Sequence, residues 1–311
     1  MISRSFIRAS DKHVVVVGGG IAGITTAFNI LDQVANSKVT LVEKAPKVAQ
    51  GASSKNGFLL CPSLDYPWTS NSIVDLNDLS NGILPKALFA PSKSPVRFQP
   101  SSLTNASLLD FGLNWVGRAQ NAKPIGALME YSMSLYKGEE KFVNLDFNQG
   151  LAKGTQTIDG KVDERDSSGD IKKFCVGLKK LMVEEHGKGG TGRLTIETNK
   201  RIKRAVTRGS EVAELKVRDE RFGTESSIFG DAFVVAAGTG SRGIVSEIGV
   251  SCPTVPVKGY LLTFSSSTEV TCNMALPNKM LLNPYIVYRG LTGGSIVYSS
   301  LGRNRDFSRS C

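Results

Sequence analysis

Apolar residues near the N-terminus form two short runs that flank a segment of helical periodicity. The first run, His13–Val17, ends at a cluster of glycines, and the second run is Lys38–Glu43. Short apolar runs beside glycines are typical of buried strands. The segment from about Ile21 to Val34 has the length and the spacing of a helix. This pattern predicts a strand–helix–strand unit, with which a parallel nucleotide-binding sheet begins.

Farther along the chain, the apolar pattern predicts one more long helix and a series of strands. Residues Ile171–Glu185 have the period of a helix that Asp170 can cap, with an apolar face made of Phe174, Leu178, Leu181 and Met182. Strands are predicted at Leu194–Glu197, on both sides of a turn at Arg208–Glu211, and at Phe233–Ala236, Tyr260–Phe264, Tyr285–Arg289 and Ser295–Tyr298. Shorter helices are expected near Ser72–Leu79, Leu108–Ala119 and Ile125–Leu135, and short strands within Gly150–Asp170.

The order of these elements predicts an α/β fold with α+β insertions. The predicted parallel sheet begins near the N-terminus and resumes only after about residue 165, which indicates one sheet interrupted by a second domain. We expect a discontinuous Rossmann-type domain of residues 12–60 plus about 165–250 to bind the nucleotide. An interleaved, mainly antiparallel-sheet substrate or cap domain is expected from about 61–164 plus 251–311.

Composition and charge narrow the class of protein. The 311 residues are 41% hydrophobic and 21% charged, and no run is apolar enough to be a transmembrane segment. A net charge of +10 suits an anionic cofactor, a nucleic acid or an anionic membrane surface. A nucleic-acid partner is not supported, because the sequence has neither zinc-finger spacing nor an aromatic RNA-binding motif. The five cysteines are widely spaced and include no CxxC pair, which argues against a disulfide scaffold and a metal site.

The glycine-rich segment Gly18-Gly19-Gly20-Ile21-Ala22-Gly23 contains the dinucleotide-binding pattern GxGxxG. It follows the first predicted strand and begins the predicted helix, which is the context that this motif requires. Gly18 allows the tight turn, Gly20 lets the backbone approach a pyrophosphate, and Gly23 lets the helix pack closely on the strand. The anion is expected at the N-terminus of the helix, where backbone N–H groups point at it.

Glu43, at the end of the second predicted strand, adds to this motif. It lies twenty residues beyond Gly23. A carboxylate at this place can accept hydrogen bonds from both hydroxyls of an adenosine ribose and repels a 2′-phosphate, which argues against NADP. A surface glutamate at a strand end is the alternative, but the glycines at the right distance favour the cofactor role. The motif by itself does not separate FAD from NAD.

A later loop carries a resemblance to a known family. Gln50-Gly51-Ala52-Ser53-Ser54-Lys55-Asn56-Gly57 resembles the Gly-Ala-Ser/Thr…Asn-Gly loop of D-amino-acid oxidase-like FAD-dependent oxidoreductases, above all the D-amino-acid dehydrogenase small-subunit branch. In that family the loop lies against the pyrophosphate and the flavin. The segments Asp166–Phe174, Val234–Gly238 and Pro256–Tyr260 are similar to the same branch, so the resemblance spans about Val14 to Tyr260. It implies that the cofactor is FAD.

The motif and the resemblance together define a set of expected cofactor-binding residues. These are Gly18, Gly20, Ile21, Ala22, Gly23, Glu43, Lys44, Ser53, Ser54, Asn56, Gly57, Ile202, Ala237 and Gly238. By the same resemblance, Ile202 lies near the adenine through its backbone. The alternative for Ile202 is a core residue in a hairpin.

The resemblance also implies a reaction, the oxidation of a D-amino acid or a related amine. Hydride passes from the carbon next to nitrogen to flavin N5, and water then hydrolyses the imine. Because the flavin supplies the difficult chemistry, no catalytic side chain is identified, and His13 and His186 are expected to be structural or exposed. The substrate carboxylate needs a cation and hydroxyl donors. The candidates are Tyr260, Tyr288 and Arg289, whose alternative role is cross-strand packing.

The sequence departs from the family in two places. Phe58 stands where the family usually carries a second glycine, and the chain stops at Cys311, where family members continue with a segment that contacts the isoalloxazine ring. We therefore expect the substrate domain to be incomplete at its C-terminus. A non-catalytic binding or assembly protein and an NAD-dependent dehydrogenase are the alternative functions.

Two properties stay open at the level of sequence. The electron acceptor is either a quinone or oxygen. The expected location is the cytoplasm, or the mitochondrion, because Met1–Ser10 contains Ser and Arg but no acidic residue.

Overall fold

The computed structural model divides the chain into two compact units, each built from two separate stretches of sequence. One unit comprises residues 1–55 and 171–254, and the other comprises residues 56–170 and 255–311. The structure describes residues 12–55, 170–252 and 254 in full, parts of residues 127–135, and the backbone of isolated strands elsewhere. That one unit binds the cofactor and the other the substrate stays a prediction.

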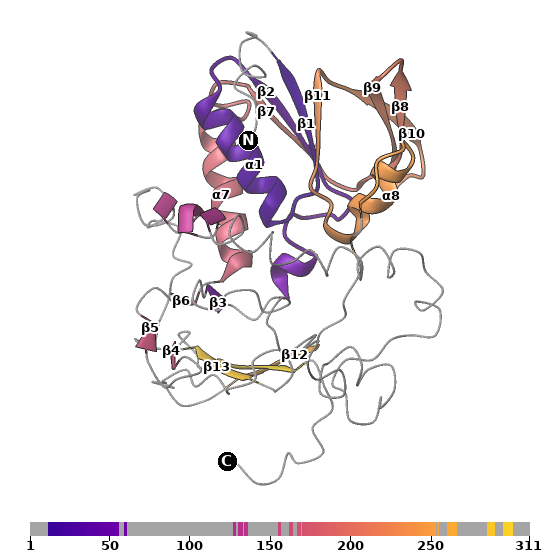
Figure 1. The fold of residues 1–311 in the computed structure, drawn as a ribbon. Helices are drawn as coiled ribbons and strands as arrows, with labels where there is room; N and C mark the ends of the chain where they lie inside the picture. Colours follow the sequence, from indigo (N-terminus) through magenta and orange to yellow (C-terminus); the bar gives the residue numbers. More distant parts are fainter. Residues whose placement is uncertain are drawn as a thin grey trace, which may run out of the picture. The chain divides into compact units, whose positions relative to one another are not determined.

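The first unit consists of three layers (Figure 1). Its middle layer is a parallel sheet in the order β11-β1-β2-β7, with β1 His13–Val17, β2 Lys38–Val42, β7 Leu194–Glu197 and β11 Ala232–Val235. Helices α1, Ile21–Gln33, and α7, Ile171–His186, lie on one face of this sheet. An antiparallel sheet in the order β10-β9-β8 lies on the other face. The strand–helix–strand start and the parallel sheet predicted from the sequence are confirmed.

Both faces of β1 are buried, which explains its unbroken apolar sequence. Val15, Val16 and Val17 are all nearly inaccessible to solvent. Because successive strand residues point to opposite faces, Val15 and Val17 pack toward the antiparallel sheet. Val16 lies on the opposite face, where α1 and α7 cover the sheet. Nonpolar burial on both sides therefore holds the three layers together.

Each long helix buries one stripe of side chains. In α1 the buried residues are Gly23, Ile24, Ala27, Phe28 and Leu31. In α7 they are Phe174, Cys175, Leu178 and Met182. Of the predicted apolar face, Phe174, Leu178 and Met182 are buried, whereas Leu181 is partly buried. The buried stripe is centred beyond Leu178 toward Met182, so that Cys175 lies within it and Leu181 lies at its margin.

The antiparallel sheet is larger than the sequence predicts. Its strands are β8 Lys200–Arg208, β9 Glu211–Asp219 and β10 Glu225–Phe229. A two-residue turn with Gly209 in the left-handed region, at φ +62°, joins β8 to β9. β10 was not predicted because only Ile228 of its residues is buried, which leaves no apolar alternation to recognise. The short helices η4, Gly238–Gly240, and α8, Ser241–Ser246, follow β11.

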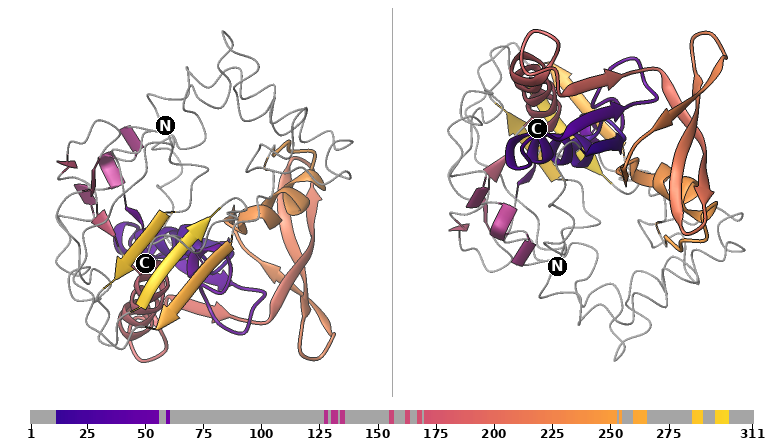
Figure 2. Two further views of the ribbon diagram at one scale, coloured as in Figure 1. Left: turned by 90° about the horizontal axis from the view of Figure 1, so that it is seen from below. Right: turned by 90° about the horizontal axis from the view of Figure 1, so that it is seen from above.

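The second unit is described mainly by its strands. Figure 2 shows an antiparallel sheet in the order β12-β14-β13, formed by Tyr260–Ser265, Ser295–Ser300 and Tyr285–Arg289. Two short pairs join β3, Leu59–Leu60, to β6, Ser167–Ser168, and β4, Thr155–Gln156, to β5, Val162–Asp163. Helical residues occur between 127 and 135, within the predicted helix, while the helices expected near Ser72–Leu79 and Leu108–Ala119 lie outside the described residues.

Within the described part of the chain, none of the helices combines the length and the apolarity that crossing a membrane requires. The same residues contain no group of three or more His, Cys, Asp and Glu side chains placed to hold a metal ion.

Arg193, just before β7, ties α1 to the sheet. Its guanidinium donates hydrogen bonds to the carbonyl oxygens of Leu31, at 2.8 Å, and Val34, at 3.2 Å. The carbonyl of Arg193 accepts a hydrogen bond of 2.8 Å from the N–H of Val39 in β2. A cation at the C-terminal end of a helix satisfies carbonyls that have no partner inside the helix and interacts favourably with the helix dipole.

We expect Arg193→Ala to lower the free energy of unfolding by about 1–3 kcal/mol, because two partly buried carbonyls lose a charged donor. Urea unfolding followed by circular dichroism measures this change. Lys188→Ala, at an exposed position in the preceding turn, is the control, with an expected change within about 0.5 kcal/mol. Equal losses in the two variants would contradict the capping role of Arg193.

Candidate functional site

Three segments meet where the parallel strands end. β1 leads into the glycine turn Gly18–Gly20, β2 leads into Glu43, and β11 leads into Ala236–Gly238. The N–H of Gly18 donates a hydrogen bond of 2.8 Å to the carbonyl of Val42, at the end of β2. The N–H of Ala236 donates an equally short bond, 2.8 Å, to the carbonyl of Val17. Ligands of open α/β sheets bind outside the carboxyl ends of the strands, so this edge is the candidate site.

The backbone of the glycine turn leaves no room for side chains at two positions. Gly18 has φ +112°, and a Cβ atom there would collide with the carbonyl of Ala236. A Cβ atom on Gly23 would overlap the carbonyl oxygen of Gly18. The turn is thus pressed between β11 and the first turn of α1. Glycine is required here by close approach and, at Gly18, also by the sign of φ.

The N-terminus of α1 is a candidate anion site. Its N-cap residue is Gly20, which offers no side-chain acceptor, and the first turn contains no acidic residue. The N–H of Ile21 donates to Ser53 Oγ at 2.9 Å. For the N–H groups of Ala22 and Gly23, no side-chain acceptor is found among the described residues. The first N–H groups of a helix have no intrahelical partner and carry partial positive charge, so the site fits a pyrophosphate.

The short helix η2, Ala52–Ser54, brings the predicted serine loop to this anion site. Ser53 lies against the helix end, and a Cβ atom on Gly20 would come within 3.2 Å of Ser53 Oγ. Ser54 donates instead to the carbonyl of Gly51 within its own loop, at 2.9 Å. Of the two serines, the structure thus brings Ser53 to the glycine turn. Asn56 and Gly57, the remaining predicted residues of this loop, lie outside the described residues.

Glu43 presents a carboxylate that two backbone N–H groups hold in place. Its Oε2 atom accepts a hydrogen bond of 2.6 Å from Gly19, and its Oε1 atom accepts one of 2.8 Å from Ala45. Each carboxylate oxygen has a second lone pair, so the group retains capacity for two further hydrogen bonds. Its place beside the glycine turn fits the two hydroxyls of a ribose. Lys44, the next predicted residue, is exposed.

Three further predicted residues lie near this edge. The side chain of Ile202, in β8, packs against a buried cluster that includes Val15, Val17 and Val42, which is its alternative role as a core residue. The adenine contact through the backbone of Ile202 stays a prediction. Ala237 packs against the same cluster, while Gly238 is exposed and has φ +57°.

The predicted substrate-binding residues belong to the second unit. Tyr260 begins β12 and is paired with Ser300 of β14. Tyr288, in β13, is paired with Ile296 of β14. Arg289 is the last residue of β13. The two tyrosines therefore match positions four residues apart along β14. Their role in binding a substrate stays a prediction.

The two histidines lie away from the carboxyl edge. His13 starts β1 at the amino edge of the sheet, where its Nε2 atom lies 2.8 Å from Thr40 Oγ1. His186 ends α7, and its Nδ1 atom lies 3.2 Å from Thr191 Oγ1.

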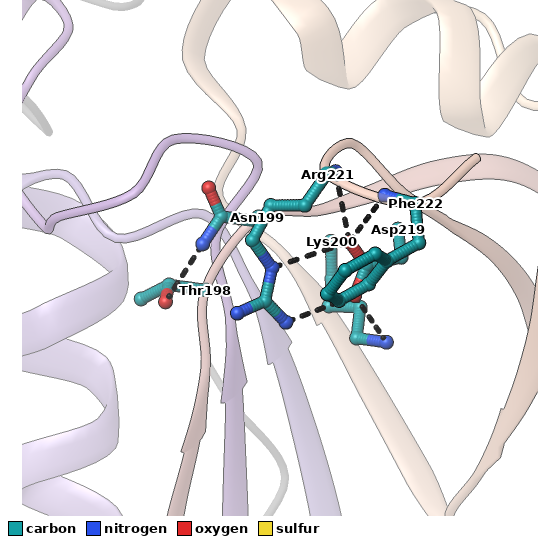
Figure 3. A network of polar contacts seen from close by, with 6 residues as sticks. All are labelled: Thr198, Asn199, Lys200, Asp219, Arg221 and Phe222. Carbon is teal, nitrogen blue, oxygen red and sulfur yellow. Dashed lines mark hydrogen bonds and ion pairs between the residues drawn. The ribbon is translucent and has the colours of Figure 1, made fainter. Parts of the chain in front are cut away.

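A buried carboxylate that the sequence did not single out contacts Lys200, whose N–H bonds to the carbonyl of Glu43. Asp219, at the end of β9, is only 3% exposed and contacts Lys200 and Arg221 (Figure 3). The Arg221 guanidinium and its backbone N–H, followed by the Lys200 ammonium, hold the pKa of the Asp219 carboxyl well below its ordinary value. An aspartate two residues before an arginine is the available sequence sign, and it occurs too often to be specific.

Comparison with known proteins assigns the chain to a family. The model of the family DAO, described as FAD dependent oxidoreductase, matches residues 13–300. A D-amino acid dehydrogenase of Neisseria meningitidis is 26% identical over 294 residues, covering 80% of this chain and 66% of the relative. A D-amino acid dehydrogenase of Vibrio vulnificus is 23% identical over 298 residues, covering 82% of this chain and 68% of the relative. The chain thus spans about two thirds of the length of these relatives.

The fold is also found among solved structures. The structure of glycine oxidase from Bacillus cereus superposes with a TM-score of 0.57 at 13% sequence identity, over 96% of this chain and 74% of that protein. At this identity the likeness shows the fold alone. It agrees with a parallel sheet combined with an antiparallel one.

We expect Gly18→Ala to lower the free energy of unfolding by about 2–4 kcal/mol, since the new methyl group meets the Ala236 carbonyl in a left-handed conformation. Gly243→Ala is the matched control, because a Cβ atom at this position in α8 has nothing within 4 Å. The control should be neutral or slightly stabilising, as alanine favours a helix. Urea denaturation of both variants checks the difference, and similar stabilities would argue against the close approach at Gly18.

The lowered pKa of Asp219 predicts a pH-dependent contribution to stability. The folded-state pKa lies below the unfolded one, so the contribution is complete above the unfolded value and is lost as the pH falls toward the folded value. The difference in unfolding free energy between the wild-type chain and Asp219→Asn should therefore shrink below about pH 5. Urea unfolding at several pH values between about 3 and 7 measures it. A difference that is constant over this range would contradict the assignment.

Proposed function

Because the chain belongs to the FAD-dependent oxidoreductase family, we propose that it binds FAD at the carboxyl edge of β1, β2 and β11 and oxidises a D-amino acid or a related amine. The supporting observation is the pairing of an open helix N-terminus with the fixed carboxylate of Glu43, beside one glycine turn. The relatives named D-amino acid dehydrogenase support the choice of substrate class.

The chain's own residues account for the recognition of the adenosine and pyrophosphate parts of the cofactor. The N-terminus of α1 and Ser53 would hold the pyrophosphate, and Gly20 lets it approach the backbone. Glu43 would accept hydrogen bonds from the ribose hydroxyls. The same carboxylate would repel a phosphate on the ribose, which selects against NADP.

In this proposal, FAD supplies an acceptor for hydride from the carbon next to nitrogen. The protein would have to bind the carboxylate of the amino acid and orient that carbon. Arg289 would provide the cation, and Tyr260 and Tyr288 would provide hydroxyl donors. The electrons then pass to a quinone or to oxygen.

The first test is the visible absorption spectrum of the full chain after FAD is added and the excess removed. Flavin bands should remain with the protein. A D-amino acid added without oxygen should bleach these bands, and the matching L-amino acid is the control. Retained FAD with equal or no response to both enantiomers would refute the proposed substrate class. A folded chain that retains no flavin would refute the cofactor site itself.

A further inference from the structure

We infer that Asp219 is a positioning residue for the adenosine end of the FAD site and that it acts through Glu43. The inference rests on the proposed function, because it concerns the site where Glu43 would bind the ribose. Asp219 itself contacts neither the glycine turn nor the carboxylate of Glu43 through any hydrogen bond among the described residues. Its influence passes through the start of β8.

The Asp219 carboxylate organises the turn between β9 and β10. Its Oδ1 atom accepts hydrogen bonds from the N–H groups of Arg221, at 2.8 Å, and Phe222, at 3.3 Å. Its Oδ2 atom lies 3.1 Å from both the Arg221 guanidinium and Lys200 Nζ. The N–H of Asp219 closes the turn by donating to the carbonyl of Thr224 at 2.8 Å. Figure 3 shows the carboxylate between these donors.

The turn between β9 and β10 holds the start of β8 in two ways. The ammonium of Lys200, the first residue of β8, pairs directly with Asp219. The N–H of Glu220, which follows Asp219, donates a hydrogen bond of 2.7 Å to the carbonyl of Asn199. Asn199 has φ +59°, a left-handed conformation that asparagine adopts more readily than other non-glycine residues. Asp219 thus fixes both the side chain and the backbone of the segment Asn199–Lys200.

The segment Asn199–Lys200 fixes the backbone of Glu43. The N–H of Lys200 donates to the carbonyl of Glu43 at 2.9 Å, and the N–H of Asn199 donates to the carbonyl of Ala45 at 3.1 Å. The carboxylate of Glu43 is held from the other side by Gly19 and Ala45. A shift of Asn199–Lys200 therefore moves the main chain from which this carboxylate projects. A misplacement of about 1 Å is enough to weaken an oriented contact strongly.

The partners of Asp219 explain how its buried carboxylate can stay ionised and hold the turn in place. A buried charge is tolerated only when it is paired and hydrogen-bonded, and Asp219 has two cations and two backbone donors. A neutral Asn keeps the shape but removes the charge that attracts Lys200 and Arg221. The neighbouring pair Arg201–Glu220, at 2.9 Å, is in the same hairpin but is solvent-exposed, so Glu220→Gln is a matched control.

The test uses the full chain and two ligands, FAD and its 2′-deoxyadenosine analogue, with affinities from quenching of flavin fluorescence. In the wild-type chain the missing hydroxyl should weaken binding about 10-fold, because it donates to a charged acceptor. Asp219→Asn should weaken FAD binding about 10-fold and bring the ratio of the two affinities close to 1. Glu43→Gln should also bring the ratio close to 1. The double variant Asp219→Asn/Glu43→Gln should bind FAD only slightly more weakly than Glu43→Gln alone. Glu220→Gln should leave the ratio unchanged.

Several results would overturn the inference. If Asp219→Asn weakens the binding of both ligands equally, so that the ratio of their affinities keeps its wild-type value, the role of Asp219 is merely structural. Additive effects of Asp219→Asn and Glu43→Gln would show that the two residues act independently. If Asp219→Asn does not fold, Lys200→Met removes one partner of Asp219 and should lower the ratio in the same direction. A wild-type chain that binds no FAD would overturn the proposed function and this inference together, whereas the other results overturn the inference alone.

Discussion

The close approach of three backbone segments at Gly18 is the constraint on which the first unit depends. At this residue the end of β1 turns into α1 while lying against the carbonyl of Ala236, and its N–H bonds to the end of β2. A Cβ atom at Gly18 would push the end of β1 away from Ala236, and one at Gly23 would push α1 away from Gly18. The turn therefore sets the distance between the helix layer and the sheet, and it also shapes the place for an anion.

The two faces of the parallel sheet serve different purposes. On one face, α1 and α7 supply apolar stripes that bury Val16 and its neighbours. On the other face, the β8–β10 sheet packs Leu215 and Val217 against Val15 and Val17. The same antiparallel sheet reaches the carboxyl edge, where Asn199 and Lys200 bond to the backbone at Glu43 and Ala45. One layer thereby contributes both to the core and to the precision of the candidate site.

The chemistry assigned to the family explains why few reactive side chains occur among the described residues of the site. A bound flavin carries out the transfer of electrons, so the protein needs donors, a carboxylate and a tightly packed turn rather than a nucleophile. Backbone N–H groups provide most of the contacts around Glu43 and Ser53. Such contacts depend on an accurately held backbone, and this is the reason for the positioning role that we infer for the buried carboxylate of Asp219.

The sequence by itself determined the features that arise from neighbouring residues. The strand His13–Val17, the helix after the glycines and the strand Leu194–Glu197 were predictable because apolar runs, periodicity and glycine turns are local patterns. The roles proposed for Gly18–Gly23 and Glu43 were readable for the same reason, since their spacing lies within one strand–helix–strand unit.

Only the tertiary structure decided which distant segments meet. Ala236 bonds to Val17, Arg193 caps α1, and Lys200 bonds to the backbone of Glu43, although these partners are far apart in sequence. Neither the polar strand β10 nor Asp219 carries a local pattern that indicates its place, because one has a single buried side chain and the other is an ordinary aspartate before a turn. Burial and hydrogen bonding among distant segments are properties of the packed chain, and they appear only once the layers have come together.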